Sequence, residues 1–216
     1  MSAQVKICGI STIEALDVAI ANDADFIGLV FFPKSPRNVS IEQAVPLAQH
    51  ARGKTKIVAL TVDADDALLH DITQNIQPDY IQAHGSETPE RIAEIKQKTG
   101  VPVIKAIKVR EHSDIALADV FKDVADIILF DAKAPDNMAN ALPGGNAISF
   151  DWSLLRSNPM PECFMLSGGL DVDNIADAVL TTDAAIFDVS SGVESSPGEK
   201  DLAAIKNFIV AMRNAG

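Results

Sequence analysis

Residues 5–32 read VKICGISTIEALDVAIANDADFIGLVFF, and this stretch contains the pattern that decides the fold. Two short apolar runs, residues 5–8 and 26–32, have the composition of buried β-strands, and residues 12–22 between them have helical periodicity. A strand, a helix and a second strand within about 30 residues are typical of the βαβ unit of a parallel sheet. The stretch therefore predicts an α/β protein.

The same alternation continues to the end of the chain. Further strands are expected to begin near Lys56, Tyr80, Val101, Ile127, Phe164 and Ala185, which brings their number to about eight. Helices are expected at residues 12–22, 41–52, 64–76, 89–99, 113–122, 152–156, 172–180 and 200–214. Repeated βα units in 216 residues favour a single-domain (β/α)8 TIM barrel spanning residues 1–216, with an open doubly wound sheet as the alternative.

Composition narrows the class of protein. A hydrophobic content of 47% is enough for a full core, and a formal net charge of −12 argues against a nucleic-acid-binding surface. The cysteines, Cys8 and Cys163, lie far apart, and no signal-peptide pattern opens the chain, so we expect a reducing, cytoplasmic setting. The longest strongly apolar run, residues 26–32, is too short to cross a membrane. These features predict a soluble protein without a membrane or nucleic-acid partner.

Titratable and glycine residues gather where the predicted strands end, which is where the active site of a (β/α)8 barrel lies. The strand ends carry Cys8, Arg37, Asp63, His84, Asp131 and Asp188. After the seventh and eighth strands come the turns Ser167-Gly168-Gly169 and Ser190-Ser191-Gly192. Glycine-rich turns let backbone N–H groups approach a phosphate, and barrels commonly bind phosphate at these two loops. The pattern predicts a phosphate site.

Three side chains are candidates for acid–base chemistry or substrate binding, and each has a structural alternative. Cys8 shares a strand face with Lys6, whose charge would lower the pKa of a thiol, although Cys8 also suits a small core position and Lys6 a buried ion pair. Asp131 ends a strand and is either an acid or a loop cap. Arg37 suits bidentate carboxylate recognition, although most arginines lie at the surface.

A resemblance to a known family follows from motifs that run in order over nearly the whole chain. They are KICG at 6–9, FFPKSPR at 31–37, QAHG at 82–85, FDA at 130–132, GG at 144–145 with FDW at 150–152, LSGGL at 166–170, DVSSGVE at 188–194 and PGEKD at 197–201. Together they resemble phosphoribosylanthranilate isomerases of tryptophan biosynthesis. The resemblance implies a (β/α)8 barrel, without cofactor or metal, that performs an Amadori rearrangement.

The resemblance also implies a role for each matching residue. Cys8 resembles the general base, Asp131 the general acid and Arg37 the residue that binds the anthranilate carboxylate, whereas His84 and Asp188 resemble substrate-contacting residues. The backbone phosphate-binding positions are Gly145, Gly168, Gly169, Ser191 and Gly192. The expected partner is a phosphorylated, carboxylate-bearing small molecule, and the expected assembly is a monomer or a homodimer.

The implied chemistry explains these residue types. A protonated Asp131 would donate to the ribose ring oxygen, and ring opening gives a Schiff base whose positive charge acidifies the proton on C2. A thiolate at Cys8 would remove that proton, and the resulting enolamine tautomerises to the ketone. Acid and base must stand on opposite sides of the sugar, which strands one and six of a barrel allow.

Some positions depart from the family pattern, and two other functions remain open. Ala83 stands where the family usually has leucine, residues 11–13 lack an arginine that it often has, and Ala147 replaces a glycine in the loop after strand six. One alternative is a bifunctional histidine and tryptophan isomerase, which pairs two aspartates and has two similar half-barrels. The other is a catalytically silent barrel that only binds a sugar phosphate.

Overall fold

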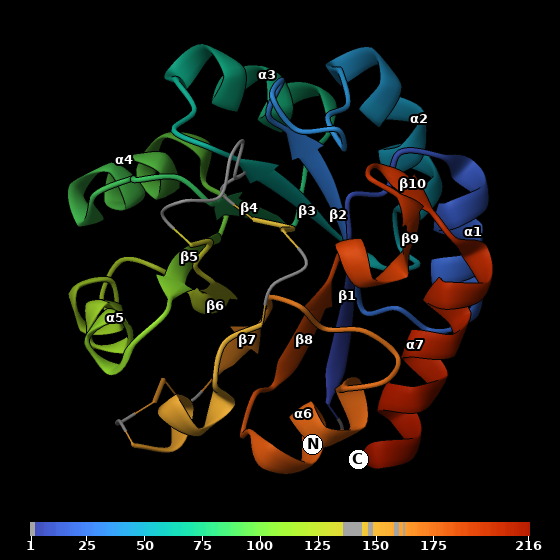
Figure 1. Ribbon diagram of the computed structural model, residues 1–216. Coiled ribbons are helices and arrows are strands. Elements are labelled where there is room, and N and C mark those ends of the chain that lie inside the picture. The colour runs from blue at the N-terminus through green and yellow to red at the C-terminus, as the bar shows by residue number, and fades with distance from the viewer. Residues whose placement is uncertain (1–2, 136–143, 147–148, 158–159, 162) are drawn as a thin grey trace.

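Eight parallel strands, each paired with the next in sequence order, close into a barrel in the computed structural model of the protein (Figure 1). The structure describes residues 3–135, 144–146, 149–157, 160–161 and 163–216. The strands are β1 Gln4–Cys8, β2 Phe26–Phe31, β3 Lys56–Thr61, β4 Tyr80–Ala83, β5 Val103–Val109, β6 Ile127–Ala132, β7 Phe164–Leu166 and β8 Ile186–Val189. Pairing of β8 with β1 closes the ring, so the predicted barrel is confirmed and the open sheet is excluded.

Each predicted strand start lies within two residues of the observed one. The largest difference is at β5, which begins at Val103 instead of Val101. The intervening Pro102 has no N–H to give to the sheet, although its carbonyl still accepts a hydrogen bond from Ile81 at 3.0 Å. A proline therefore delays the start of the strand.

Helices surround the barrel and follow most strands (Figure 1). They are α1 Ile13–Ala21, α2 Ile41–Ala51, α3 Asp66–Asn75, α4 Pro89–Thr99, α5 His112–Ile115, α6 Ile175–Thr181 and α7 Leu202–Ala215, with 3₁₀ turns η1 Ala116–Val120, η2 Trp152–Ser157 and η3 Ser191–Val193. Sequence signals mark several ends: Ser40 and Gln43 form a capping box on α2, and Gly100 ends α4 in the left-handed region at φ 68°.

The helix expected over residues 113–122 is wrong in type. Only His112–Ile115 is α-helical, and residues 116–120 form the 3₁₀ turn η1. The buried residues of this segment, Ile115, Ala118 and Phe121, recur every three residues, which is the period of a 3₁₀ helix. Packing of that row against the barrel favours the tighter winding.

A short hairpin between β8 and α7 was not predicted. Strand β9, Glu194–Ser196, pairs antiparallel with β10, Glu199–Lys200. Lys200 was expected to start the last helix, but that helix begins at Leu202, after its N-cap Asp201. The hairpin instead places Lys200 beside the barrel mouth, where its amine donates to the backbone oxygen of Ser190 at 2.9 Å.

The hydrophobic core has two parts. The larger part lies between the strands and the surrounding helices. The smaller part fills the barrel itself and consists of Phe26, Val58, Ile104, Ala106, Ile127, Leu129, Met165 and Ile186. Polar residues replace this apolar filling toward the C-terminal ends of the same strands, because Asp131 and Asp188 each lie two residues beyond an interior residue of β6 or β8.

Within the described residues, no helix is long and apolar enough to cross a membrane. The segment between β6 and η2 is described only in part, because residues 136–143 and 147–148, including Ala147, lie outside the described residues.

Candidate active site

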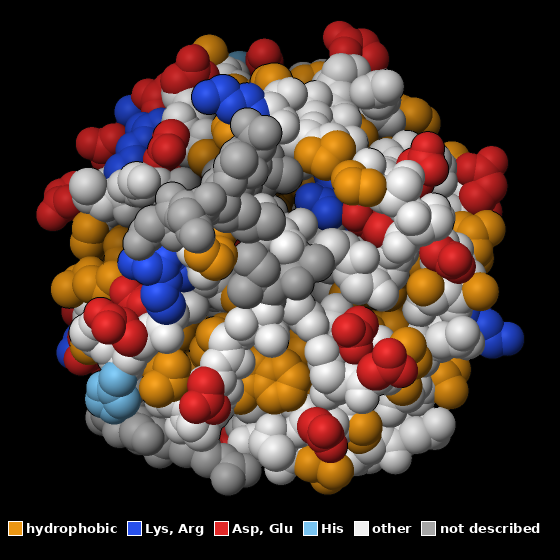
Figure 2. Space-filling model, viewed as in Figure 1, with side chains coloured by type: hydrophobic (Ala, Val, Ile, Leu, Met, Phe, Trp, Pro, Cys, Tyr) orange, Lys and Arg blue, Asp and Glu red, His pale blue; other side chains and the backbone are white. Residues whose placement is uncertain are grey.

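A cavity opens at the C-terminal ends of the strands. It encloses about 640 Å³ when the space open to solvent is included. Viewed from the same side as Figure 1, the molecule has a recess over the barrel in which acidic and basic side chains lie close together (Figure 2). The lining residues come from the ends of strands β2, β3, β4, β6, β7 and β8 and from the loops that follow them.

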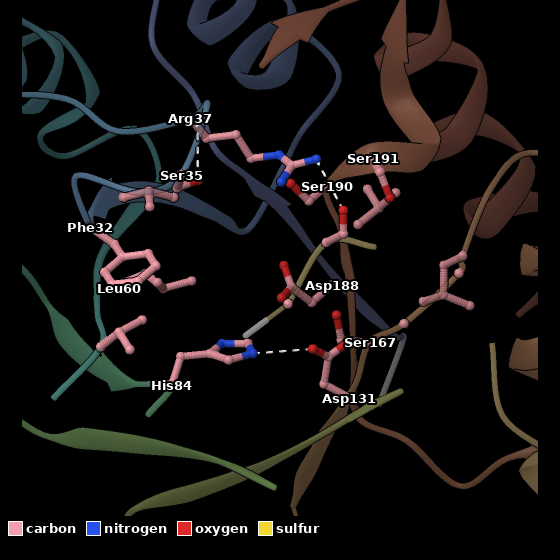
Figure 3. Close-up of a pocket in the computed structure, with 18 residues that line it drawn as sticks. Phe32, Ser35, Arg37, Leu60, His84, Asp131, Ser167, Asp188, Ser190 and Ser191 are labelled. Carbon is pink, nitrogen blue, oxygen red and sulfur yellow. Dashed lines mark hydrogen bonds and ion pairs between the residues drawn. The ribbon is translucent and has the colours of Figure 1, made fainter. Parts of the chain in front are cut away.

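Asp131 and His84 form a pair at one side of the cavity (Figure 3). Asp131, on β6, is 2% exposed, and its Oδ2 lies 3.1 Å from Nε2 of His84 at the end of β4. Gln82 lies behind the pair, with its Nε2 2.8 Å from Nδ1 of His84. Both predicted residues therefore face the cavity and contact each other, and the loop-cap alternative for Asp131 is wrong.

Gly144 covers this pair. A Cβ atom at residue 144 would lie 2.7 Å from Nε2 of His84 and 2.8 Å from Oδ2 of Asp131, closer than real side chains pack. The position therefore needs glycine, and the backbone there separates part of the pair from solvent.

Cys8 is fully buried and is not among the residues described as lining the cavity. Its thiol lies alongside Gly28, where a Cβ would come within 2.8 Å of Sγ. Burial raises the pKa of Cys8, the positive charge of Lys6 opposes this shift, and Asp188 adds to it. Lys6 thus acts in the predicted direction, but burial is the larger effect and the pKa of the thiol is raised overall.

Lys6 and Asp188 form a buried ion pair beneath the cavity. The Lys6 amine lies 2.9 Å from Oδ1 of Asp188, and the side chains are 0% and 4% exposed. Burial disfavours the charged amine, but Asp188 and Cys8 together outweigh this effect and raise the pKa of Lys6. The ion-pair alternative for Lys6 is therefore confirmed. Asp188 also lines the cavity.

Arg37 lies in the cavity wall and is bound from behind by Glu194. Its Nε and Nη2 donate to the two carboxylate oxygens of Glu194 at 2.7 and 2.8 Å, and Nη2 also lies 3.3 Å from the carbonyl oxygen of Gly145. Glu194 also accepts a hydrogen bond from Lys200 at 2.7 Å. Burial raises the pKa of Glu194, but the hydrogen bonds and charges of Arg37 and Lys200 together lower it, so the carboxylate is ionised.

Glu194, Lys200 and Gln82 contact the site residues, although the sequence predicted no role for them. All three occur inside quoted motifs, DVSSGVE, PGEKD and QAHG. Lys200 is also close enough to Cys8 for its charge to lower the pKa of the thiol. Their position as polar residues inside these motifs could have singled out the three residues, but it does not show which side chains they contact.

The predicted phosphate-binding positions are only partly brought together. Gly145, Gly168, Gly169 and Ser191 line the cavity, with φ of 72° at Gly145 and 92° at Gly168. Gly192 is not among the described lining residues; it packs against the carbonyl oxygen of Leu170, where a Cβ would overlap. Helix α6 begins at Ile175, three residues after the expected start at residue 172, so its N-terminus is not directly at the glycine pair.

No group of histidine, cysteine and acidic residues in the described part of the chain has the arrangement of a metal site. The cavity instead combines a carboxyl–imidazole pair, a guanidinium held by a carboxylate, and glycine-rich turns.

Comparison with known proteins identifies the family. The family model described as N-(5'-phosphoribosyl)anthranilate isomerase matches residues 5–211. The chain belongs to this family. N-(5'-phosphoribosyl)anthranilate isomerase from Rhizobium meliloti is 51% identical over 215 residues, which cover 100% of this chain and 99% of the relative.

Solved structures of phosphoribosylanthranilate isomerases agree with the fold. The Thermotoga maritima isomerase superposes with a TM-score of 0.87 at 33% identity and covers 98% of this chain and 99% of its own. A structure described as a complex with reduced 1-(o-carboxyphenylamino)-1-deoxyribulose 5-phosphate has a TM-score of 0.83 at 31% identity, with coverage of 98% and 99%. The predicted fold and family are confirmed, and the residue roles stay predictions.

Proposed function

We propose that the chain converts N-(5'-phosphoribosyl)anthranilate to 1-(2-carboxyphenylamino)-1-deoxyribulose 5-phosphate, an Amadori rearrangement in tryptophan biosynthesis. One observation carries the proposal. A single cavity holds the Asp131–His84 pair, the fixed guanidinium of Arg37 and the glycine turns after β6 and β7. These groups match the sugar, the carboxylate and the phosphate of one substrate.

Arg37 is the proposed anchor of the anthranilate carboxylate. Glu194 fixes Nε and Nη2, so the plane of the guanidinium is set before substrate arrives, which lowers the entropy lost on binding. Phe32, Leu60 and Val62 line the same cavity and would contact the aromatic ring. Backbone N–H groups near Gly168, Gly169 and Ser191, together with Gly145 beside Arg37, would bind the phosphate, with Gly192 holding two loops together.

Asp131 is the proposed general acid and Cys8 the proposed general base. Protonated Asp131 gives its proton to the ribose ring oxygen, which opens the ring to a Schiff base. Cys8 then takes the proton from C2, and the electron pair of the broken C–H bond neutralises the cationic nitrogen. Because burial raises the pKa of Cys8, the thiol is protonated in the free enzyme near neutral pH. It must therefore release its proton to solvent before it takes the one from C2, and the positive charge of the Schiff base favours this release.

The activity is tested by following the loss of anthranilate fluorescence when purified protein is given phosphoribosylanthranilate. We expect turnover by the wild type, and a loss of about 10²-fold or more in kcat for Cys8→Ser and for Asp131→Asn. Cys163→Ser is the matched control, since Cys163 is exposed and outside the cavity. Absence of turnover by the wild type would reject the proposed function. Binding without turnover would favour the silent sugar-phosphate barrel.

The proposed location is the cytoplasm, which is supported by two cysteines that are both free thiols, one of them exposed. The quaternary structure is proposed as a monomer or a homodimer. Light scattering on the purified protein separates these two states.

A further inference from the structure

Gln82 reaches the active site only through His84. It is 0% exposed on β4, two residues before His84, so both side chains point to the same side of the strand. Its Nε2 lies 2.8 Å from Nδ1 of His84, whereas its Oε1 is buried and has no hydrogen-bond partner among the described residues. Buried polar atoms without a partner are rare in folded proteins.

The orientation of this amide determines which histidine nitrogen carries a proton. An amide nitrogen only donates, so when it faces Nδ1 the imidazole is neutral with its proton on Nε2. Nε2–H then donates to Oδ2 of Asp131, 3.1 Å away, and a hydrogen bond donated to this oxygen favours the ionised carboxylate. In this arrangement Oδ2 of Asp131 carries no proton to give to a substrate.

Turning the amide by 180° gives the opposite arrangement. The carbonyl oxygen of Gln82 now accepts a hydrogen bond from Nδ1–H, so a neutral His84 presents an unprotonated Nε2. That nitrogen accepts from the O–H of a protonated Asp131. The second arrangement holds one proton more than the first, taken from solvent, and that proton is the one a general acid needs.

We propose that Gln82 is a positioning residue whose amide rotation sets the tautomer of His84 and thereby the protonation of Asp131. The inference deepens the proposed function, since it assumes that Asp131 is the general acid. Rotation breaks no other described side-chain hydrogen bond of Gln82, because only one end of its amide has a partner. The free enzyme with the amide nitrogen toward His84 corresponds to the state before proton uptake.

Burial makes the orientation of the amide decisive. Gln82, His84 and Asp131 are all 5% exposed or less, and Gly144 covers the contact between the last two. Water therefore competes weakly with the three side chains, and a mismatched donor or acceptor there stays without a partner. The other ionisable groups described at this end of the barrel include Lys6 and Cys8 on β1, Arg37 after β2, Asp63 after β3, Glu87 after β4, Lys105 and Lys108 on β5, Asp188 on β8, and Glu194 and Lys200 in the hairpin.

Two variants at residue 82 change the constraint on His84 in different ways. In Gln82→Glu an ionised carboxylate only accepts, which fixes the proton on Nδ1 and favours protonated Asp131. In Gln82→Met neither donor nor acceptor remains, and His84 is free to take either tautomer. Gln97→Met, on the exposed face of α4, is the matched control for the change of glutamine to methionine.

The first measurement is the ¹⁵N spectrum of the His84 ring nitrogens in free protein at pH 8. We expect the Nε2–H tautomer in the wild type and in Gln97→Met, and the Nδ1–H tautomer in Gln82→Glu. The second measurement is the pH profile of kcat/KM. Its alkaline limb should move up by about one pH unit in Gln82→Glu, and kcat should fall about 10-fold in Gln82→Met with KM changed less than about 3-fold.

The outcomes separate this inference from the proposed function. The same His84 tautomer in wild type and Gln82→Glu, with unchanged pH profiles, would overturn the role of Gln82 even in a fully active enzyme. An inactive wild type would reject the proposed function, while the ¹⁵N spectra would still decide whether the amide sets the tautomer. If Gln82→Met fails to fold, the comparison of wild type with the nearly isosteric Gln82→Glu decides alone.

Discussion

At the scale of single residues, the environment of the Cys8 thiol contains opposing charges. Burial and the Asp188 carboxylate raise its pKa, while the amines of Lys6 and Lys200 lower it. Lys200 belongs to the hairpin after β8, and burial lowers its own pKa although Glu194 favours its charged form. A residue that stands outside the barrel strands therefore influences the proposed base.

Removing the Lys200 charge should raise the pKa of the Cys8 thiol further. In a Cys163→Ser background, the thiolate absorbance of Cys8 should appear at higher pH in Lys200→Met than in the parent protein, and the rise of kcat/KM with pH should shift the same way. Lys206→Met, on an exposed position of α7, is the control and should change neither. A thiolate titration that is unaltered in Lys200→Met would show that this amine does not act on Cys8.

At the scale of elements, the loop after β4 is fixed by one buried carboxylate. Oε1 of Glu87 accepts backbone hydrogen bonds from Asp63 at 2.9 Å and Gly85 at 3.1 Å, and Oε2 lies 2.7 Å from the amine of Lys105. Lys105, on β5, points away from the barrel interior and lies over the ring of Phe121 at 5.7 Å. These contacts hold the turn directly after His84.

This pair should make stability depend on acidic pH. Burial raises the pKa of Glu87, but the charge and hydrogen bond of Lys105, together with backbone hydrogen bonds, outweigh this effect, so the pKa lies below the ordinary 4.5. The ionised carboxylate thus stabilises the fold above about pH 4.5, and this stabilisation is lost as the pH falls through the lowered pKa. Lys105→Met should reduce the free energy of unfolding by about 3 kcal/mol and start acid unfolding at higher pH.

Urea unfolding between pH 3 and pH 8 measures both effects. Lys98→Met is the matched control, because the Lys98 amine pairs with Asp66 at the surface and its side chain is 52% exposed. Such a pair contributes less than about 1 kcal/mol. Equal losses of stability in the two variants would contradict the buried role of Lys105.

The elements also show what sequence alone predicts. Strand starts were predictable because each buried strand is a short apolar run bounded by turn residues. The 3₁₀ turn η1 was missed because a three-residue spacing of buried side chains is close to the helical period. Hairpin β9–β10 was missed because two strands of three and two residues leave no periodicity to detect.

For the candidate site, the positions of several residues could be predicted, but not the contacts between them. Asp131, His84 and Arg37 could be placed at one mouth, because the C-terminal ends of parallel strands meet there. The partners Glu194 and Gln82 could not, since a bidentate contact over 157 residues of sequence separation and the orientation of one amide depend on three-dimensional packing. The net rise in the pKa of Cys8 could not be predicted either, because the strand pattern does not give the degree of burial.

At the scale of the whole molecule, the barrel closes where its first strand meets its last. Strands β1 and β8 pair in parallel, with Lys6 opposite Asp188 in the register. The 2.9 Å ion pair between their side chains joins residues 182 positions apart, at the seam that turns a sheet into a barrel. The raised pKa of Lys6 means that the pair stabilises the fold below about pH 10.5, and the stabilisation is lost as the pH rises through the raised value.

Breaking this seam should destabilise the entire barrel. Lys6→Met leaves the Asp188 carboxylate buried without its cation, which costs about 3–5 kcal/mol of unfolding free energy. Asp188→Asn leaves the amine of Lys6 buried without its carboxylate, so this variant should also be strongly destabilised. The double variant removes both charges, and its loss should be smaller than the sum of the two single losses by about 1–3 kcal/mol.

Urea unfolding of the four proteins at pH 8, followed by far-UV circular dichroism, gives this coupling energy directly. The pair Lys96 and Asp126, 2.7 Å apart on the surface, provides a control cycle with Lys96→Met and Asp126→Asn, in which the coupling should stay below about 1 kcal/mol. Additive losses at Lys6 and Asp188 would mean that each charge is stabilised independently of the other. A coupling confined to the Lys6–Asp188 cycle would show that this ion pair stabilises the contact between β1 and β8. Both charges also act on the pKa of Cys8, so the same pair would connect the stability of the barrel with its proposed catalytic thiol.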